Sequence, residues 1–303
     1  MQSEFLTGGL KAGLEPSLRP GLRRITAPNP SPMTFTGTQT YLLGEGEVAV
    51  IDPGPASPAH LEAILGALHP NERITQILVT HSHLDHSPLA RPLSEATGAP
   101  VLGAGASDWG RSPIMQALSG GIGGGEGVDD SFVPDVQIAE GDVIDGPWGR
   151  IEVLETPGHM ANHLSFAWGD ALFSGDLVMG WSTSLVSPPD GDMTAFYASL
   201  TRLEGRGDAI YFPGHGDPVT APQLRCAELL AHRRGREAQI LDALTQTGPA
   251  NATALARHIY TDVAAALLPV AARNVLAHLI DLSGRAEVTA ESPVRADTAF
   301  RIE

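Results

Sequence analysis

Short apolar runs bounded by glycine and polar residues recur through the first part of the chain. Residues 39–43 and 47–52 are two β-prone runs, and Gly44-Glu45-Gly46 between them indicates a hairpin. Residues 74–80 form a continuous apolar run of strand length, which is typical of a strand covered on both faces. The same pattern predicts four further strands, at residues 151–155, 164–168, 171–174 and 209–212.

One helix is predicted among these strands from its start signal and its periodicity. Ser57 can cap the first turn, and Pro58 suits the first helical position. Apolar residues then recur at helical spacing, at Leu61, Ile64, Leu65 and Leu68. Strands interspersed with covering helices predict a layered α/β fold.

The character of the sequence changes near residue 224, where glycine- and proline-rich segments give way to a helical pattern. The remainder predicts three helices and then two short strands, at residues 286–289 and 299–302, with Gly284 ending the third helix. This order of elements resembles a small winged-helix unit. We therefore predict two domains, residues 1–224 and residues 225–303.

The composition excludes several classes of protein. The 303 residues are 42% hydrophobic and 18% charged, which supplies a packed core and argues against disorder. A single cysteine, Cys226, excludes a disulfide scaffold and a cysteine-based metal cluster. The net charge of −16 repels nucleic-acid backbones and membrane surfaces at long range, which disfavours a nuclease without excluding one.

No secretory or membrane segment is expected. Residues 1–20 lack the uninterrupted apolar stretch of a secretory signal. No apolar run approaches the roughly 18 residues that a membrane helix needs. We therefore expect a soluble, cytoplasmic protein without a membrane partner.

A dense group of metal-binding side chains follows the strand predicted at residues 74–80. It lies in the segment His81-Ser82-His83-Leu84-Asp85-His86. Imidazole and carboxylate ligands suit zinc and other first-row ions. Side chains in an extended segment alternate, so His81 and His83 share one side, whereas Asp85 and His86 follow the start of a turn. One short loop can therefore serve two metal ions.

Three more candidates each follow a short apolar strand and have glycine beside them. They are His159, Asp176 and His215. Glycine at these places lets the backbone turn tightly and approach an ion closely. Together with the first group they make seven candidate ligands, five histidines and two aspartates.

The segments THSHLDHS, TPGH, SGD and PGHG occur in that order, and with them the chain resembles the metallo-β-lactamase superfamily across residues 52–216. The resemblance implies an αββα sandwich with the ligands along one edge of its two sheets, followed here by the winged-helix-like domain. Asp52, in the segment Asp52-Pro53-Gly54, matches the family's early Asp-Gly turn. It would orient a ligand imidazole through a hydrogen bond.

The resemblance also implies how the seven residues divide between two ions. One ion would be held by His81, His83 and His159, and the second by Asp85, His86 and His215. Asp176 would bridge both ions. This implies two Zn²⁺ per chain, with iron or manganese as alternatives, and catalytic roles for Asp85 and Asp176.

The reaction implied by such a site is hydrolysis. Two ions would share a water whose pKa falls toward about 7, and the resulting hydroxide would attack a carbonyl or phosphoryl centre. No serine or cysteine nucleophile is needed. The first hypothesis is therefore a dinuclear zinc hydrolase that acts on small esters or thioesters. Membership of the superfamily does not itself imply β-lactam hydrolysis.

The C-terminal part supplies the main alternative. The arginine-rich segment 232–237 followed by a winged-helix pattern is similar to the lactamase-beta-2-like and hydroxyacylglutathione-hydrolase-like branch, which includes single-strand-specific endoribonucleases. Single-stranded RNA is therefore an alternative substrate if Arg233, Arg236 and Arg273 line one path to the metals. Further alternatives are a mono-iron dioxygenase of the same fold and a non-catalytic winged-helix regulator. A homodimer is compatible with each of these.

Several other polar residues are interpreted as structural. These are Cys226, expected to be inert, and the histidines His60, His69, His232, His258 and His278. His163 has two interpretations, a role in orienting substrate or a proton, and a structural hydrogen bond. We expect the loops at residues 103–135 and 178–194 to shape the pocket.

Overall fold

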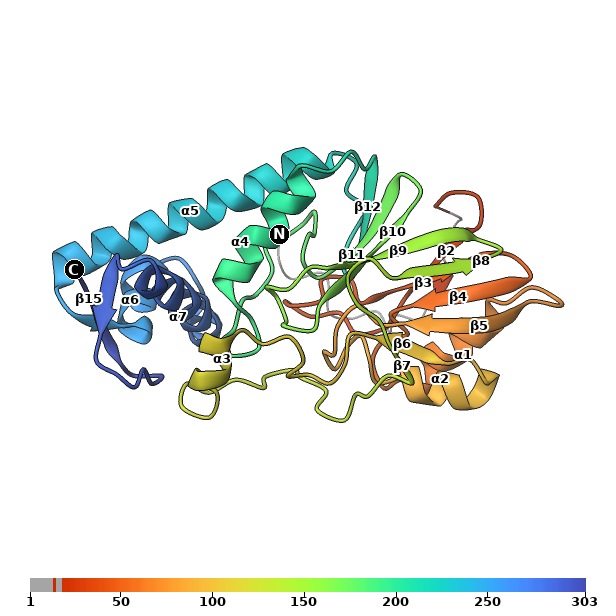
Figure 1. Cartoon of the computed structure of the whole chain (residues 1–303), viewed down its shortest axis with the longest axis horizontal. Coiled ribbons are helices and arrows are strands. Elements are labelled where there is room, and N and C mark those ends of the chain that lie inside the picture. The colour runs from red at the N-terminus through yellow and green to blue at the C-terminus, as the bar shows by residue number, and fades with distance from the viewer. Residues whose placement is uncertain (1–12, 15–17) are drawn as a thin grey trace.

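The computed structural model of the chain describes residues 13–14 and 18–303 (Figure 1). The segment for which no secretory signal was predicted therefore lies largely outside the described residues. Two sheets pack face to face. The first has the strand order β1-β2-β3-β4-β5-β6-β7, with β1 Gly13–Leu14, β2 Leu22–Thr26, β3 Gln39–Leu43, β4 Glu47–Ile51, β5 Arg73–Leu78, β6 Val101–Gly103 and β7 Val136–Gln137. The second has the order β12-β11-β10-β9-β8, with β8 Val143–Gly146, β9 Gly149–Glu155, β10 Leu164–Trp168, β11 Ala171–Gly175 and β12 Ile210–Pro213.

The space between the sheets is the central core. Tyr41 and Ile51 of the first sheet pack there with Phe166 and Phe173 of the second, and all four side chains are almost fully buried. Tyr41 meets Phe173 edge to face, with ring centroids 5.2 Å apart. This apolar filling holds the two sheets together.

Helices cover the outer face of each sheet (Figure 1). Helix α1 (Pro58–Gly66) and helix α2 (Ala90–Thr97) pack on the first sheet through a second apolar cluster. Helix α4 (Met193–Glu204) and the first half of helix α5 (Pro222–Thr247) pack on the second sheet. The predicted αββα sandwich is thus confirmed. The Ser57 side chain caps α1 as predicted, accepting a hydrogen bond from the backbone N–H of His60.

Every predicted strand has a counterpart whose ends lie within two residues of the prediction. Strand β2 is one of the strands that were not predicted, and its sequence explains why the pattern missed it. Its sequence is LRRIT, and two adjacent arginines conceal the apolar pattern. The Arg23 guanidinium is nevertheless buried, because it pairs with Glu72 at 2.8 Å and donates to the carbonyl of Ala67.

The C-terminal domain is the predicted winged-helix unit. Its helical elements are α6 (Ala252–Ile259), the short 3₁₀ helix η1 (Ala265–Leu267) and α7 (Leu268–Gly284). Strands β14 (Val288–Ala290) and β15 (Ala299–Ile302) form the predicted antiparallel hairpin. A further short strand, β13 (Ala250–Asn251), was not predicted and pairs with β15.

Helix α5 runs without a break through the predicted domain boundary at residue 224 and contributes to both domains (Figure 1). Cys226 and Leu229, near its beginning, belong to the core beneath the second sheet. Ile240 and Leu244, near its end, belong to the core of the C-terminal domain. Ile122, on the loop after helix α3 (Pro113–Leu118), is fully buried in that same core. The two domains therefore share packed elements.

The expectation that no segment is long and apolar enough for a membrane span is wrong by those two criteria. Residues 265–284 pass both, with a mean hydropathy of 1.4 in the span's apolar window. Half of that window is buried within the protein, where Val275 and Leu279 of α7 fill the C-terminal core.

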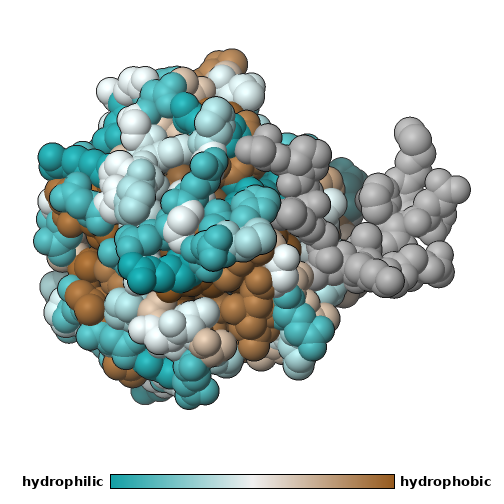
Figure 2. Space-filling model, turned by 90° about the vertical axis from the view of Figure 1, so that its right-hand side faces the viewer, coloured by the Kyte–Doolittle hydropathy of each residue, from teal (hydrophilic) through white to brown (hydrophobic). Residues whose placement is uncertain are grey.

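At the end of the molecule farthest from the C-terminal domain, hydrophilic residues cover most of the visible surface, with apolar residues in a band between them (Figure 2).

Candidate metal centre

The sheet topology brings the seven candidate side chains to one edge of the sandwich. In the first sheet β4 and β5 are parallel, so Asp52 and the segment 81–86 leave the sheet at neighbouring strand ends. In the second sheet β9, β11 and β12 point the same way, because β10 is antiparallel to both β9 and β11 and β12 is parallel to β11. His159, Asp176 and His215 follow these three strands. Their side chains therefore meet those of residues 81–86 between the two sheets.

The donor atoms fall into groups that could each hold an ion. One group is His81, His83 and His159, another is Asp85, His86 and His215, and Asp176 joins His81 and His86 in a third. Asp176 also lies close to one histidine of each of the first two groups. Its Oδ2 is 3.2 Å from His215 Nε2 and 3.7 Å from His159 Nε2. All seven predicted residues are brought together, and Asp176 lies between the two groups that the resemblance implied.

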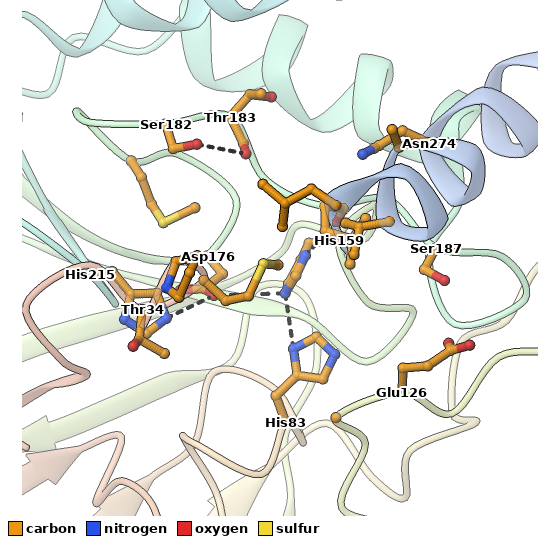
Figure 3. A pocket seen from close by; sticks show the side chains of 18 of the residues that line it. Thr34, His83, Glu126, His159, Asp176, Ser182, Thr183, Ser187, His215 and Asn274 are labelled. Atoms are coloured by element: carbon orange, nitrogen blue, oxygen red, sulfur yellow. Dashed lines mark hydrogen bonds and ion pairs between the residues drawn. The ribbon is translucent and has the colours of Figure 1, made fainter. Parts of the chain in front are cut away.

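The three imidazoles of the first group direct nitrogens toward one another at hydrogen-bonding distance. His83 Nδ1 lies 2.9 Å from His159 Nε2 (Figure 3) and 2.9 Å from His81 Nε2. His159 Nδ1 lies 2.6 Å from the carbonyl of Leu185 and must donate to it. His159 Nε2 is therefore an unprotonated nitrogen whose lone pair points toward His83.

The tautomer of His81 is fixed through Thr80. The Thr80 hydroxyl donates to Asp52 Oδ2 at 2.7 Å, so it can only accept from His81 Nδ1, which lies 3.0 Å away. His81 Nε2 therefore also directs a lone pair inward. Burial, reinforced by neighbouring imidazoles, holds the pKa of His81 well below its usual value, and burial together with His159 lowers the pKa of His83 to about 3. These three rings are neutral near pH 7, as metal ligands must be.

The second group combines imidazole and carboxylate donors. His215 Nε2 lies 3.1 Å from Asp85 Oδ2, and His86 Nε2 lies 3.4 Å from the same oxygen and 3.5 Å from Asp176 Oδ1. His215 Nδ1 faces the carbonyl of Gly37 at 3.2 Å and donates to it. Although burial opposes protonation, Asp176 and Asp85 raise the pKa of His215 to about 9. The two carboxylates therefore favour positive charge beside the Nε2 atoms of His86 and His215. A bound cation can supply this charge in place of protons.

The residues fit divalent metal ions. His86 Nε2 and Asp176 Oδ1 are buried polar atoms that face each other at 3.5 Å, and neither has a hydrogen-bond partner. Buried polar atoms without hydrogen bonds are costly, and an ion that joins the two would remove this cost. The donor set consists of imidazole nitrogens and carboxylate oxygens, which suits zinc, iron or manganese.

Asp52 orients the cluster from behind, as predicted. Its carboxylate accepts hydrogen bonds from His86 Nδ1 at 2.9 Å and from both the backbone N–H and the hydroxyl of Thr80 at 2.7 Å. The residue has φ of +50°, a strained conformation that these three hydrogen bonds hold in place. One carboxylate thus fixes the rings of both His86 and, through Thr80, His81.

Glycine at position 214 allows the close approach that its neighbour His215 needs. A Cβ on Gly214 would lie 2.4 Å from Asp176 Oδ1 and 2.6 Å from His86 Cε1. Any side chain there would collide with two of the candidate ligands. At Gly214, glycine thus permits the close approach at the site that was predicted for the turn glycines.

His163 takes the structural one of its two predicted roles. Its Nε2 accepts a hydrogen bond from the backbone N–H of Asp176 at 3.2 Å, so its Nδ1 donates to Thr156 Oγ1 at 2.9 Å. The ring is almost fully buried and does not line the cavity beside the metal centre. It positions the backbone of Asp176.

The remaining histidines and the cysteine lie away from the cluster. Neither these histidines nor Cys226 belong to a candidate metal group within the described part of the chain, and none of them lines the cavity. The histidines are His60, His69, His232, His258 and His278. His60 Nε2 lies 2.8 Å from Thr40 Oγ1, a hydrogen bond beneath the first sheet. Burial raises the pKa of the Cys226 thiol to about 12, which makes it unreactive, as predicted.

A cavity of about 590 Å³ opens onto the centre and is lined by His83, Asp85, His159, Asp176 and His215 (Figure 3). The predicted loops contribute to its walls, residues 126–127 from one and much of residues 179–190 from the other. Residues 32–34 and several residues of the C-terminal domain complete the lining. Those parts were not predicted, because no local pattern shows that segments so far apart in sequence face one cavity.

The arginines of the C-terminal part do not line this cavity. Arg233, only 2% exposed, donates to the carbonyl of Ser184 and to Asn274 Oδ1. Arg273 donates to the carbonyls of Ile122 and Pro188 and to Ser187 Oγ. Arg236 lies over the Tyr260 ring, 4.0 Å from its centroid. The condition set for an RNA path, three arginines leading to the metals, is therefore not met.

Arg233 and Arg273 instead brace the loop between β11 and α4. Arg225 adds two hydrogen bonds of 2.8 Å, to the carbonyls of Met179 and Ser182. The same loop supplies the Leu185 carbonyl that fixes His159. The C-terminal part of the chain thereby supports a candidate metal ligand through the loop.

Comparisons with known proteins agree with this picture. Residues 33–215 match the family model described as the metallo-beta-lactamase superfamily, and residues 252–293 match the beta-lactamase associated winged helix domain. The chain is 30% identical over 268 residues to the beta-lactamase-like protein 2 homolog of Drosophila melanogaster, covering 86% of each chain. It is also similar to a solved metallo-beta-lactamase family protein from Thermus thermophilus, with a TM-score of 0.76 and 26% identity over 95% of this chain and 100% of that one.

A further relative is named as a thioesterase. The chain is 31% identical over 236 residues to the atrochrysone carboxyl ACP thioesterase of Aspergillus fumigatus. The match covers 75% of this chain and 66% of the thioesterase. The matches confirm the predicted resemblance in both domains.

Removing a candidate ligand is expected to empty the site without unfolding the chain. Asp176→Ala or His83→Ala should lower the bound metal and abolish hydrolysis, while circular dichroism stays unchanged. Asp217→Ala is a matched control, because the Asp217 side chain is 92% exposed. Full metal content and full activity in either variant would contradict the assignment.

Asp52→Asn tests the orienting role. Loss of the carboxylate should weaken metal binding by about 10- to 100-fold, because the His86 and His81 rings lose their fixed tautomers. The measurement is the zinc dissociation constant by competition with a chromophoric chelator. The control is Asp145→Asn, on the exposed edge strand β8. Equal affinities in the two variants would show that Asp52 does not act on the centre.

Arg233→Ala tests the bracing of the loop. Truncation leaves the buried Ser184 carbonyl without its donor and opens a void, so the free energy of unfolding should fall by about 2 kcal/mol or more. Arg257→Ala, on the exposed face of α6, should change it by less than about 0.5 kcal/mol. Urea unfolding followed by fluorescence measures the free energy of unfolding of both variants. An Arg233→Ala variant as stable as the wild type would exclude a bracing role.

Proposed function

Because this chain belongs to the metallo-beta-lactamase superfamily, we propose that it is a dinuclear zinc hydrolase of small esters or thioesters. The observation that carries the proposal is the convergence of seven nitrogen and oxygen donors at one sheet edge. A 2-His-1-carboxylate triad suffices for a mono-iron oxygenase, so seven donors favour two ions over one. Iron and manganese remain alternatives for the identity of the ions.

His81, His83 and His159 would hold one ion and Asp85, His86 and His215 the other, with Asp176 between them. Two such ions supply Lewis acidity at a carbonyl oxygen and make a water molecule acidic enough to react near neutral pH. In the overall reaction, water adds to the carbonyl carbon and the bond to sulfur or oxygen breaks. The products are a carboxylic acid and a thiol or alcohol, each of which receives one of the protons of water.

The residues of the chain that touch the reacting groups are the two carboxylates. Asp85 and Asp176 both line the cavity. We assign them the uptake of a proton from the attacking water, as well as ion binding. Thr38 Oγ1 donates to Asp85 Oδ2 at 3.1 Å and holds this carboxylate in position.

A small uncharged substrate agrees better with the charges than RNA does. Among the described residues, no arginine or lysine lines the cavity, whereas nucleic-acid binding depends on such groups along the phosphate path. The net charge of −16 acts in the same direction. The similarity to an acyl-carrier thioesterase supports a thioester substrate in particular. Two observations favour RNA as the second candidate: the winged-helix domain, and the similarity to a beta-lactamase-like protein 2 homolog, whose branch includes single-strand-specific endoribonucleases.

A turnover screen on one metal-loaded preparation separates these candidates. We expect cleavage of an acetyl or butyryl thioester and no cleavage of a single-stranded oligoribonucleotide. Chelation should abolish the turnover, and added Zn²⁺ should restore it. RNA cleavage without thioester cleavage would replace the first proposal by the second. Turnover that survives complete removal of metal would contradict both.

A further inference from the structure

The cavity beside the metal centre extends from the candidate ligands to the C-terminal domain. His215 and Asn274 of α7 lie on opposite sides of it (Figure 3). Its volume of about 590 Å³ falls within the range of about 300–1,000 Å³ that is usual for small-molecule sites. There is therefore room for a substrate group well beyond the reacting carbonyl.

Much of the wall of this extension is apolar. Leu267, Val270 and Ala271 contribute from η1 and α7. Met33, Trp181 and Leu185 contribute from the sandwich domain. Both domains thus offer hydrocarbon surface to the same space, and such surface gains most from contact with hydrocarbon.

Positive charge is missing from these walls. Outside the seven-residue cluster, the charged side chains among the described lining residues are Glu126 and Asp190. Asp190 is already paired with Arg111 at 2.6 Å and accepts the backbone N–H of Gly125 at 2.7 Å. Arg233 and Arg273 donate to backbone carbonyls of the loop between β11 and α4. An anionic group at the far end would lose its hydration and face Glu126 and Asp190 on the wall, because the nearby cations Arg111 and Arg273 lie outside the lining and are already hydrogen-bonded.

We propose that this cavity binds the uncharged, apolar acyl chain of an ester or thioester, and that Val270 on α7 limits the chain length. The inference rests on the proposed function, since the carbonyl would lie at the metal centre. The acyl chain then runs along α7. The winged-helix domain, in this proposal, is the part of the protein that selects the acyl group.

The first test needs no variant. We measure kcat/KM of the metal-loaded full-length protein on N-acetylcysteamine thioesters with saturated acyl chains from acetyl to dodecanoyl. Burial of each added methylene should raise kcat/KM about fourfold until the chain reaches the wall. A succinyl thioester should be cleaved at least about tenfold less efficiently than a butyryl thioester, because its carboxylate is desolvated without a partner. A profile that is flat with chain length, in an active enzyme, overturns the inference.

Val270→Phe then tests the wall itself. The larger side chain should lower the ratio of kcat/KM for the longest chain that the wild type accepts to kcat/KM for acetyl by about tenfold or more. Ala266→Phe is the matched control, because Ala266 is exposed on η1 and does not line the cavity. Equal length profiles in the two variants would exclude Val270 as the limit.

A binding measurement makes the inference independent of catalysis. Octanamide, a neutral acyl mimic, is titrated into chelator-treated protein and followed by tryptophan fluorescence, since Trp181 lines the cavity. We expect saturable binding that Val270→Phe weakens and Ala266→Phe does not. If no thioester is cleaved but octanamide binds in this pattern, the proposed hydrolysis fails and the acyl site stands. If thioesters are cleaved but octanamide does not bind, the acyl site fails and the hydrolysis stands.

Discussion

The hydrogen bonds that the imidazoles make on the side away from the metal centre determine what the centre can do. His81 donates through Nδ1 to Thr80, His86 to Asp52 and His159 to the Leu185 carbonyl. Each bond occupies one ring N–H, so the opposite nitrogen of the neutral ring directs its lone pair inward, toward Asp176 and the other rings. A cluster of inward lone pairs and carboxylate oxygens is stable only with positive charge at its centre. The tautomers thus commit this part of the fold to binding cations.

The outer partners of the rings belong to elements that the fold itself positions. Asp52 ends β4 and Thr80 follows β5, so their hydrogen bonds depend on the parallel pairing of these strands. The Leu185 carbonyl depends on the loop that Arg225, Arg233 and Arg273 hold from the C-terminal part of the chain. The second domain therefore has two effects on the centre. It steadies a ligand from behind, and it supplies one wall of the cavity in front.

The sequence was most informative where a function depends on neighbours along the chain. Strands such as residues 164–168 were predictable from a local apolar pattern. Residues 81–86 were predictable because a dense group of polar side chains directly follows such a pattern. The buried arginines of β2 were not, because Glu72, which neutralises Arg23, is distant in sequence. The role of Arg233 and Arg273 was likewise hidden, since an arginine that braces a loop and one that binds RNA look alike in a sequence. The apolar residues of α7 resembled core residues, yet some of them face the cavity.

Crystals of the zinc-loaded protein, measured on both sides of the zinc absorption edge, test the central claim most directly. An anomalous difference map should show two peaks per chain. One should lie among His81, His83 and His159 and the other among Asp85, His86 and His215, with Asp176 between them. A single peak bound by only one group of residues, or no peak at this edge of the sheets, would contradict the two-ion centre.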